Sequence, residues 1–224
     1  DVRSTMGAFR AMGVEIEELE GGRLIRVHGR GIQGLRAPTA PLDMGNSGTS
    51  MRLLAGILAG AGLPATLTGD ASLCRRPMRR VTEPLSRMGA TLAAQASGTP
   101  PIVLHGGTRL QAGLFADGKT SVTEPAPTRD HTERMLRGCG VRLEVDGARV
   151  SLEGGQRLSA MQVTVPADIS SAAFFIVGAS IAPGSDLLLP NVGVNPTRTG
   201  VLDILEAMGA NIERRNLRTV GGEP

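Results

Sequence analysis

The chain has 224 residues, of which 41% are hydrophobic and 20% are charged, and this composition is that of a protein with a packed core rather than a disordered one. The formal net charge of +3 is mild, and no apolar run approaches the roughly 18 residues that a membrane span needs. Cys74 and Cys139 match neither a metal-ligand spacing nor a disulfide framework, so we expect a reducing, cytoplasmic setting. The chain does not open with Met, which we interpret as the start of a piece of a longer protein.

Four segments share one signature, in which an apolar-periodic helix ends in a glycine and an alternating strand follows. Their glycines are Gly13, Gly89, Gly140 and Gly209. A glycine just beyond a helical pattern is the usual left-handed C-cap. After Gly140, Asp146-Gly147 separates two alternating stretches, 141–145 and 149–152. Each unit is therefore predicted to end in a β-hairpin.

Loops that combine proline and arginine precede three of these helices. They contain Arg76-Pro77, Pro127-Thr128-Arg129 and Pro196-Thr197-Arg198. Apolar helices expected at 49–61 and 170–181 come before two of the loops, each with a strand in between. Taken cyclically, the pattern is a repeated βαβαββ unit of about 70 residues.

The middle copy of the repeat is short. The four glycines are separated by 76, 51 and 69 residues along the chain. The shortfall falls near Gln111-Ala112, where the end of a helical pattern follows without its beginning. Either the segment has been deleted, or the protein contains it and the chain as given omits it, and we favour the second reading.

The strongest local signal for chemistry is the stretch 45–54, in which small polar residues lead directly into an apolar helix. Backbone N–H groups at a helix N-terminus, approached closely at a glycine, bind anions. Asn46, Ser47 and Thr49 are also good N-caps, so capping alone explains the stretch equally well. It is not a P-loop, because the Gly-Lys-Ser/Thr ending is missing.

Arginines gather in the first of the proline-containing loops, at positions 75, 76, 79 and 80. A solvated basic face is one interpretation. The recurrence of arginine as Arg129 and Arg198 in the equivalent loops supports anion binding for at least one of them. Asp168 is expected to cap the following helix.

The three histidines suggest no metal site. His28 and His105 are expected on strands in structural roles, and no pairing of histidine with glutamate points to a metal. His131 follows Arg129 closely and is expected to cap or orient that loop.

At these motifs the chain resembles the 5-enolpyruvylshikimate-3-phosphate synthase family. The matching stretches are 1–3, 45–54, 69–73 with 76–78, 124–133, 166–175 and 195–200. The resemblance implies an α+β fold with repeated βαβαββ units around a pseudo-threefold axis, in a two-domain enolpyruvyl transferase architecture that is incomplete here. Residues 1–165 would form most of the N-terminal-half domain, and 166–224 the first unit of the second domain.

The resemblance also implies the site and the reaction. Gly48 and Arg76 would contact phosphoenolpyruvate, Asn46 and Thr49 would shape the same wall, where glyphosate competes, and Arg129 would hold shikimate 3-phosphate. The enolpyruvyl group would pass to the 5-hydroxyl of shikimate 3-phosphate with release of phosphate, in the shikimate pathway. No metal or organic cofactor, nucleic acid or membrane partner is implied, and the expected state is a monomer.

Parts of the family pattern are missing from the chain. The N-terminal Lys-Ser motif, the serine-rich segment of the gap near 111 and the acid/base residues are absent. Because acid–base catalysis needs those groups within reach of the substrate, catalytic residues are expected outside this chain, which alone should not turn over.

Three other interpretations remain. UDP-N-acetylglucosamine enolpyruvyl transferase shares the fold and chemistry, but its reactive cysteine lies in a Gly-rich loop, whereas Cys74 stands only two residues before Arg76. A nucleic-acid-binding module fits the pI of about 9.6 but lacks aromatic residues for base stacking. An inactive fragment that binds one substrate is the third.

Overall fold

The computed structural model describes residues 2–107, 110, 113–114, 116–126 and 128–224. The chain forms two compact units, one of residues 1–120 with 153–155 and the other of residues 121–152 with 156–224. The domain boundary expected after residue 165 does not coincide with this division, because 121–152 pack with 156–224; it stays a prediction about the whole architecture. The predicted gap at Gln111-Ala112 lies outside the described residues, as do Asp1 and Pro127.

The first unit begins with a helix followed by a hairpin. Helix α1 (Val2–Ala11) leads through a positive-φ Gly13 into strands β1 (Glu15–Leu19) and β2 (Leu24–His28), with a short 3-10 turn (Glu20–Gly22) between them. The strands are antiparallel, and Glu15 is opposite His28. This order of helix, glycine and hairpin is the one predicted for the end of a repeat unit.

A complete repeat unit follows and confirms the predicted βαβαββ order. Its elements are β3 (Leu42–Asp43), α2 (Gly48–Ala61), β4 (Ala65–Thr68), α3 (Arg79–Arg87), β5 (Leu92–Ala93) and β6 (Ile102–Leu104), with 3-10 turns at Ile32–Gly34 and Leu73–Arg75. The strand order in the sheet is β3-β4-β6-β5. Strands β3 and β4 are parallel, and the other pairs are antiparallel.

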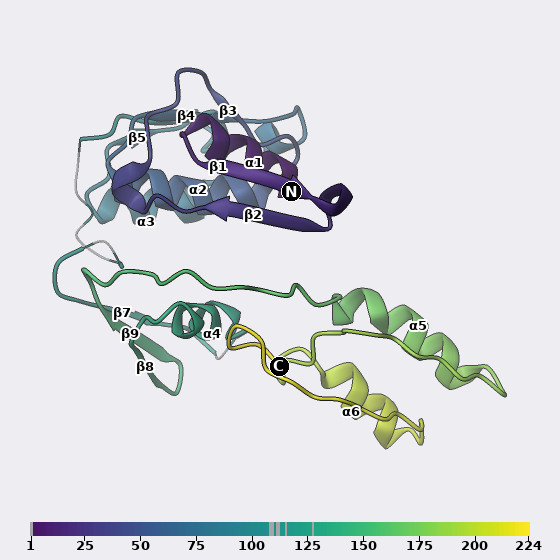
Figure 1. The fold of residues 1–224 in the computed structure, drawn as a ribbon. Coiled ribbons are helices and arrows are strands. Elements are labelled where there is room, and N and C mark those ends of the chain that lie inside the picture. Colours follow the sequence, from purple (N-terminus) through teal and green to yellow (C-terminus); the bar gives the residue numbers. More distant parts are fainter. Residues whose placement is uncertain (1, 108–109, 111–112, 115, 127) are drawn as a thin grey trace. The chain divides into compact units, whose positions relative to one another are not determined.

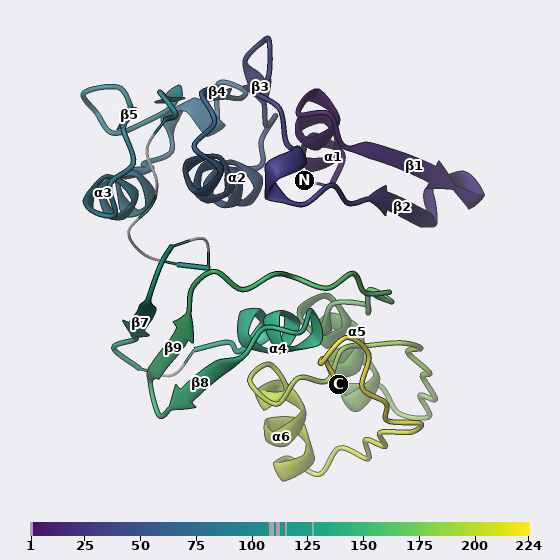
Figure 2. The same cartoon turned by 60° about the vertical axis from the view of Figure 1, so that its left-hand side comes forward.

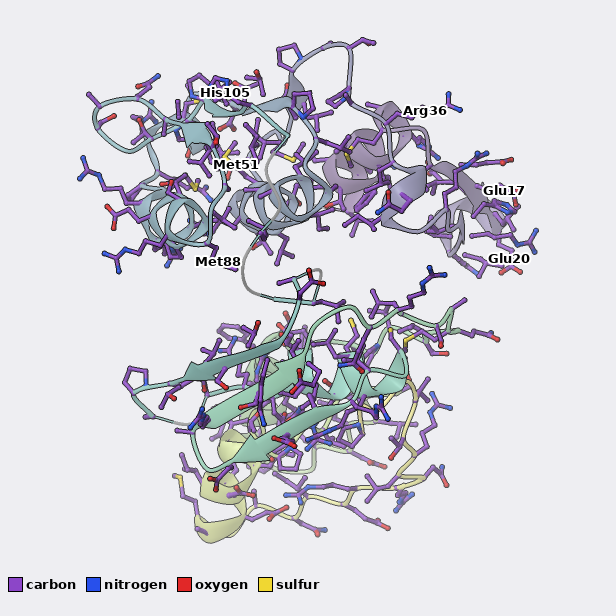
Figure 3. The ribbon with its side chains drawn as sticks, turned by 90° about the vertical axis from the view of Figure 1, so that its left-hand side faces the viewer. Glu17, Glu20, Arg36, Met51, Met88 and His105 are labelled. Atoms are coloured by element: carbon purple, nitrogen blue, oxygen red, sulfur yellow. The ribbon has the colours of Figure 1, made fainter. Side chains whose placement is uncertain are left out.

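Helices α2 and α3 lie side by side on one face of this sheet (Figures 1 and 2). The buried positions of α2 recur at helical spacing, at Met51, Leu54 and Leu58, and none of the three is more than 1% exposed. Figure 3 shows Met51 inside the unit, with Glu17 and Glu20 at its outer edge. Burial of one such side chain stabilises the fold by about 1.5–3 kcal/mol, so α2 is held firmly against the sheet.

The parallel pairing of β3 and β4 decides where the loops of this unit meet. Because parallel strands end at the same edge of a sheet, the loop that enters α2 and the loop that leaves β4 start side by side. Two backbone hydrogen bonds extend this pairing, from Met44 N to Thr68 O and from Asp70 N to Gly45 O, each 2.9 Å long. The N-terminus of α2 therefore faces the loop of residues 69–78.

The described residues of the second unit form three helices and most of a three-stranded sheet. Strands β7 (Lys119–Thr123), β8 (Leu143–Asp146) and β9 (Arg149–Glu153) form the sheet in the order β7-β9-β8, and the predicted β8–β9 hairpin is confirmed. Helix α4 (His131–Gly138) precedes β8. Helices α5 (Ile169–Ile181) and α6 (Gly200–Ala207) share a small core around Ile169, Ala172 and Leu202.

Two expectations about strands are wrong. No hairpin follows α6 within the described residues: 210–219 contain no strand, since 213–216 (Glu-Arg-Arg-Asn) interrupt the alternation. His105 lies one residue beyond β6 rather than on a strand. None of the described helices has the length and apolar content needed to cross a membrane.

Candidate functional site

The entry to α2 is capped by a serine. Ser47 is 2% exposed, and its Oγ accepts a hydrogen bond from Ser50 N at 3.1 Å. The Oγ atoms of Ser47 and Ser50 lie 2.6 Å apart, and Thr5 Oγ1 lies 2.7 Å from Ser50 Oγ. Of the three N-cap candidates, Asn46, Ser47 and Thr49, the structure thus selects Ser47. The side chain of Asn46 is left for other contacts.

Asn46 links a carboxylate to an arginine across the two loops. Its Nδ2 donates to Asp70 Oδ2 at 2.8 Å, and its Oδ1 accepts a hydrogen bond from Arg76 Nη2. Leu73 N also donates to Asp70, at 2.7 Å. The hydrogen bond from Asn46, followed by that from Leu73, holds the pKa of Asp70 below its ordinary value. An ionised Asp70 orients the amide so that its oxygen faces Arg76.

The guanidinium groups of Arg52 and Arg76 lie in front of Gly48, and the charge of Arg80 acts on Arg52. A Cβ added to Gly48 would lie 3.2 Å from Arg52 Nη1 and 3.3 Å from Arg76 Nη1. Burial lowers the pKa of Arg52, and the positive charges of Arg80 and Arg76 lower it further. Within the part of the chain that the structure describes, none of the three arginines belongs to a salt bridge.

Arg52 has an unused hydrogen-bond donor. Its Nε is buried and has no hydrogen-bond partner among the described residues. An unpaired buried donor on a cation costs free energy, and an oxyanion would satisfy it. Arg52 is not among the predicted site residues, although it stands one helical turn beyond Gly48, so an i, i+4 reading of α2 would have found it.

The remaining residues considered from the sequence, Thr49, Arg129 and Cys74, form no hydrogen bond or ion pair with Asn46 or Arg76 in the described part of the chain. Thr49 is exposed in the first turn of α2. Arg129 is exposed in the loop before α4, in the second unit, and forms no hydrogen bond or ion pair among the described residues. Cys74 is partly buried, and its Sγ donates to Gly69 O at 3.3 Å. The first unit therefore brings together Asn46, Gly48 and Arg76.

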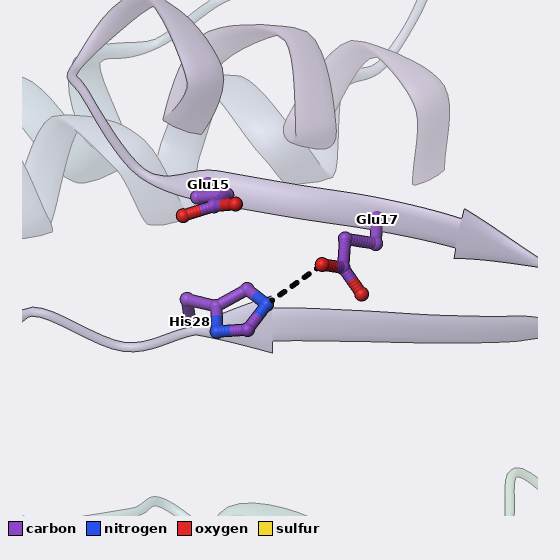
Figure 4. Close-up of side chains that lie close together, drawn as sticks. All are labelled: Glu15, Glu17 and His28. Atoms are coloured by element: carbon purple, nitrogen blue, oxygen red, sulfur yellow. Dashed lines mark ion pairs between the residues drawn. The ribbon is translucent and has the colours of Figure 1, made fainter.

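A cluster of two glutamates and a histidine lies on the first hairpin (Figure 4). Glu17 is 3.2 Å from His28 Nε2, and Arg26 Nη1 donates to Glu17 at the same distance. The expectation that no pairing of histidine with glutamate points to a metal stays a prediction, although the hairpin does bring His28 to Glu15 and Glu17. The antiparallel register, which sets Glu15 opposite His28, creates this surface cluster, and the ion pair within it joins Glu17 to His28.

A complete βαβαββ unit defines a protein of the repeated αβ class. The N-terminus of α2, where the parallel strands of that unit end, is cationic and has the chemistry of an anion site. The model of the family described as "EPSP synthase (3-phosphoshikimate 1-carboxyvinyltransferase)" matches residues 1–223. The chain belongs to the EPSP synthase family.

Individual relatives agree with this assignment. The chain is 59% identical to the 3-phosphoshikimate 1-carboxyvinyltransferase of Methylococcus capsulatus and 56% identical to that of Alkalilimnicola ehrlichii. Each alignment extends over 243 residues and covers all of this chain. It covers 55% of the first relative and 54% of the second. The chain thus spans about half the length of the curated relatives it matches. The alignments exceed the 224 residues of the chain, which agrees with the short middle repeat.

A solved structure has the same fold. The EPSP synthase from Acinetobacter baumannii is 49% identical to this chain and superposes with a TM-score of 0.93, over 99% of this chain and 54% of the other. The predicted α+β fold of an enolpyruvyl transferase, incomplete in this chain, is confirmed.

Proposed function

We propose that the protein transfers the enolpyruvyl group of phosphoenolpyruvate to the 5-hydroxyl of shikimate 3-phosphate and releases phosphate. The relatives at 50–59% identity carry the name of this activity. The observation that supports the same activity for this chain is the pair of guanidinium groups, Arg52 and Arg76, in front of Gly48, in which Arg52 Nε is buried without a hydrogen-bond partner among the described residues.

The chemistry of the cluster suits an anionic substrate whose leaving group is a phosphate. Phosphoenolpyruvate would lie with an anionic group against Arg76 and Arg52 and near the backbone of Gly48 at the helix N-terminus. Negative charge builds on the phosphate as its bond to the enol carbon breaks, and preoriented guanidinium groups stabilise that charge. Asn46 would hold Arg76 in place through its hydrogen bond, while Thr49 would border the entrance.

Shikimate 3-phosphate would be held in part by Arg129, whose guanidinium has no partner in the described chain. The general acid and base would come from outside these 224 residues, so the chain alone would bind but not turn over. We also propose a monomeric, cytoplasmic protein in which residues 1–165 belong to one domain and 166–224 begin the other.

The test compares the product of the complete gene with the 224-residue chain. Intact mass is measured first, and then phosphate release with phosphoenolpyruvate and shikimate 3-phosphate, separately and together. We expect release by the complete product only when both substrates are present, and none by the chain. UDP-N-acetylglucosamine replaces the acceptor as a control and should support no release. A complete product that releases no phosphate with both substrates would overturn the proposal.

A further inference from the structure

A buried amide in the second unit joins three segments that are far apart in the sequence. Asn195 is 3% exposed, and its Nδ2 donates to Asp130 Oδ1 at 2.8 Å and to Glu223 Oε2 at 3.0 Å. Its Oδ1 accepts hydrogen bonds from Thr197 N at 2.8 Å and from Thr197 Oγ1 at 2.7 Å. The amide therefore uses both of its hydrogens and both oxygen lone pairs.

His131 completes the cluster. Its Nδ1 lies 2.8 Å from Glu223 Oε1 and 3.3 Å from Asn195 Nδ2. An ionised carboxylate only accepts hydrogen bonds, so Nδ1 carries a proton and donates to Glu223, and both hydrogens of Asn195 remain for the two carboxylates. Burial raises the pKa of Asp130, but the hydrogen bonds from Asn195 and Arg134 outweigh it and hold that pKa below its ordinary value.

The turn that contains Glu223 is pressed against α4. A Cβ on Gly222, whose φ is +88°, would lie 2.5 Å from Arg134 O, and a Cβ on Gly138 would lie 2.6 Å from Gly221 O. Side chains at these positions would collide with backbone, so the close approach requires glycine. The turn thus holds the Glu223 carboxylate in a fixed position, and Asn195 links this carboxylate to Asp130 at the start of α4.

The residue immediately before this cluster is Arg129. Asp130 and His131 begin α4, and both are held by the cluster, whereas the Arg129 side chain is exposed without a partner in the described chain. The backbone conformation of a loop residue sets the direction in which its side chain leaves the chain. The backbone at 129–130 is directed by the contacts of Asp130 with Asn195 and Arg134, the latter at 2.7 Å.

We infer that Asn195 is a positioning residue for Arg129: its buried amide fixes the start of α4 and so sets the direction in which Arg129 meets the phosphate-bearing substrate. The inference rests on the proposed function, in which Arg129 binds shikimate 3-phosphate. An amide is specified here, because aspartate in its place keeps the size, loses both donors and adds a third carboxylate beside Asp130 and Glu223.

The experiment uses the product of the complete gene and measures the KM for each substrate. Asn195→Asp is expected to raise the KM for shikimate 3-phosphate about tenfold and to change the KM for phosphoenolpyruvate less than twofold. Asn211→Asp is the matched control, because it replaces the same residue type with the same change of charge at an exposed position of the same unit. Glu223→Gln, a milder change that keeps the shape, should raise the KM for shikimate 3-phosphate about threefold and serves if Asn195→Asp does not fold.

A double-variant cycle separates positioning from a merely structural role. Arg129→Ala alone should raise the KM for shikimate 3-phosphate, and adding Asn195→Asp should raise it no further, because the side chain being positioned is gone. An unchanged KM in Asn195→Asp, or effects of the two substitutions that multiply, would overturn the inference while leaving the proposed function intact. A wild-type protein that neither releases phosphate nor binds shikimate 3-phosphate would overturn the proposed function and the inference with it.

Discussion

Arg198 donates from Nη2 to Asp168 Oδ1 over 2.9 Å, so the arginine at the N-terminus of α5 is neutralised within the chain. Arg76 reaches the N-terminus of α2 from the corresponding loop, but it bonds the neutral amide of Asn46 and belongs to no ion pair among the described residues. The two N-caps account for the difference, since Asp168 is an acid and Ser47 is neutral. The positive charge of the first site is therefore not neutralised by an ion pair among the described residues.

Gly48→Ala should weaken the binding of phosphoenolpyruvate. The new Cβ would lie 3.2 and 3.3 Å from guanidinium nitrogens of Arg52 and Arg76, and these groups would have to move by a few tenths of an ångström. We expect the KM for phosphoenolpyruvate to rise about tenfold, or about 1.4 kcal/mol of binding free energy. Steady-state kinetics on the complete gene product measure this rise.

Gly56→Ala is the control for that substitution. Gly56 lies in the same helix with nothing within 4 Å of its added Cβ, and replacing it should raise the free energy of unfolding by up to about 1 kcal/mol without a change in KM. Equal KM values for the wild type and Gly48→Ala would contradict the placement of the substrate in front of α2.

Arg52→Met should separate stability from anion binding. The substitution removes a charge that Arg76 and Arg80 repel and a buried Nε that has no hydrogen-bond partner among the described residues, so the melting temperature without ligand should stay the same or rise. The rise in melting temperature caused by phosphoenolpyruvate should fall by more than half, because an anion contact is lost. Thermal unfolding with and without phosphoenolpyruvate measures both effects.

The matched change of charge is Arg87→Met, at the exposed last turn of α3. It should cost a few tenths of a kcal/mol through the lost interaction with the helix dipole and leave the effect of phosphoenolpyruvate unchanged. A ligand-free Arg52→Met protein clearly less stable than the wild type would show that Arg52 has a partner in the folded chain.

Stability should fall at acid pH. The pKa values of Asp70, Asp130 and Asp168 are all below their ordinary value in the folded chain. For Asp168 the hydrogen bond from Ser170 N is the largest cause. A carboxyl whose folded pKa is depressed contributes stability above its unfolded pKa, about 3.9, and loses that contribution as pH falls through the folded pKa.

The urea midpoint should therefore be level near neutral pH and decline below about pH 5. Asp130→Asn should lower the midpoint at pH 7 and make its decline shallower, because the group that must take up a proton is absent. A wild-type midpoint independent of pH down to pH 3 would disprove the assignment of these hydrogen bonds to the folded state.

Helix α5 exposes an apolar surface that we expect to be buried in the complete gene product. Phe174, Phe175 and Ile181 are 81%, 64% and 76% exposed, although the corresponding helix α2 is largely buried. A helix that is apolar on all sides belongs in a core. Phe174→Ser should reduce self-association of the 224-residue chain in sedimentation, and lower the unfolding free energy of the complete gene product by about 3–5 kcal/mol.

Leu53→Ser is the control, since Leu53 is 65% exposed on the first unit. It should leave the association state unchanged, because singly exposed apolar residues are normal on a protein surface. Phe174→Ser without effect on either protein would mean that the α5 surface is solvated in the native state.

Local signals predicted the elements of the fold well and the site in part. The apolar period of α2 and the glycines that end α1, α3, α4 and α6 depend on neighbours in the sequence, so they are readable without a structure. The sequence could not predict that Ser47, rather than Asn46 or Thr49, caps α2. The Oγ of Ser50, which contacts Ser47, also contacts Thr5, 45 residues away in the sequence.

The sequence by itself determined the repeat, the family and the residue types of the candidate anion site, because periodicity, caps and motifs are properties of contiguous segments. The tertiary structure decided which of them converge. Arg52 joins Arg76 because the parallel pairing of β3 and β4 brings the entry of α2 to the loop after β4. Arg198 is neutralised and Asn195 is buried because segments many residues apart meet in space, and such contacts leave no local pattern.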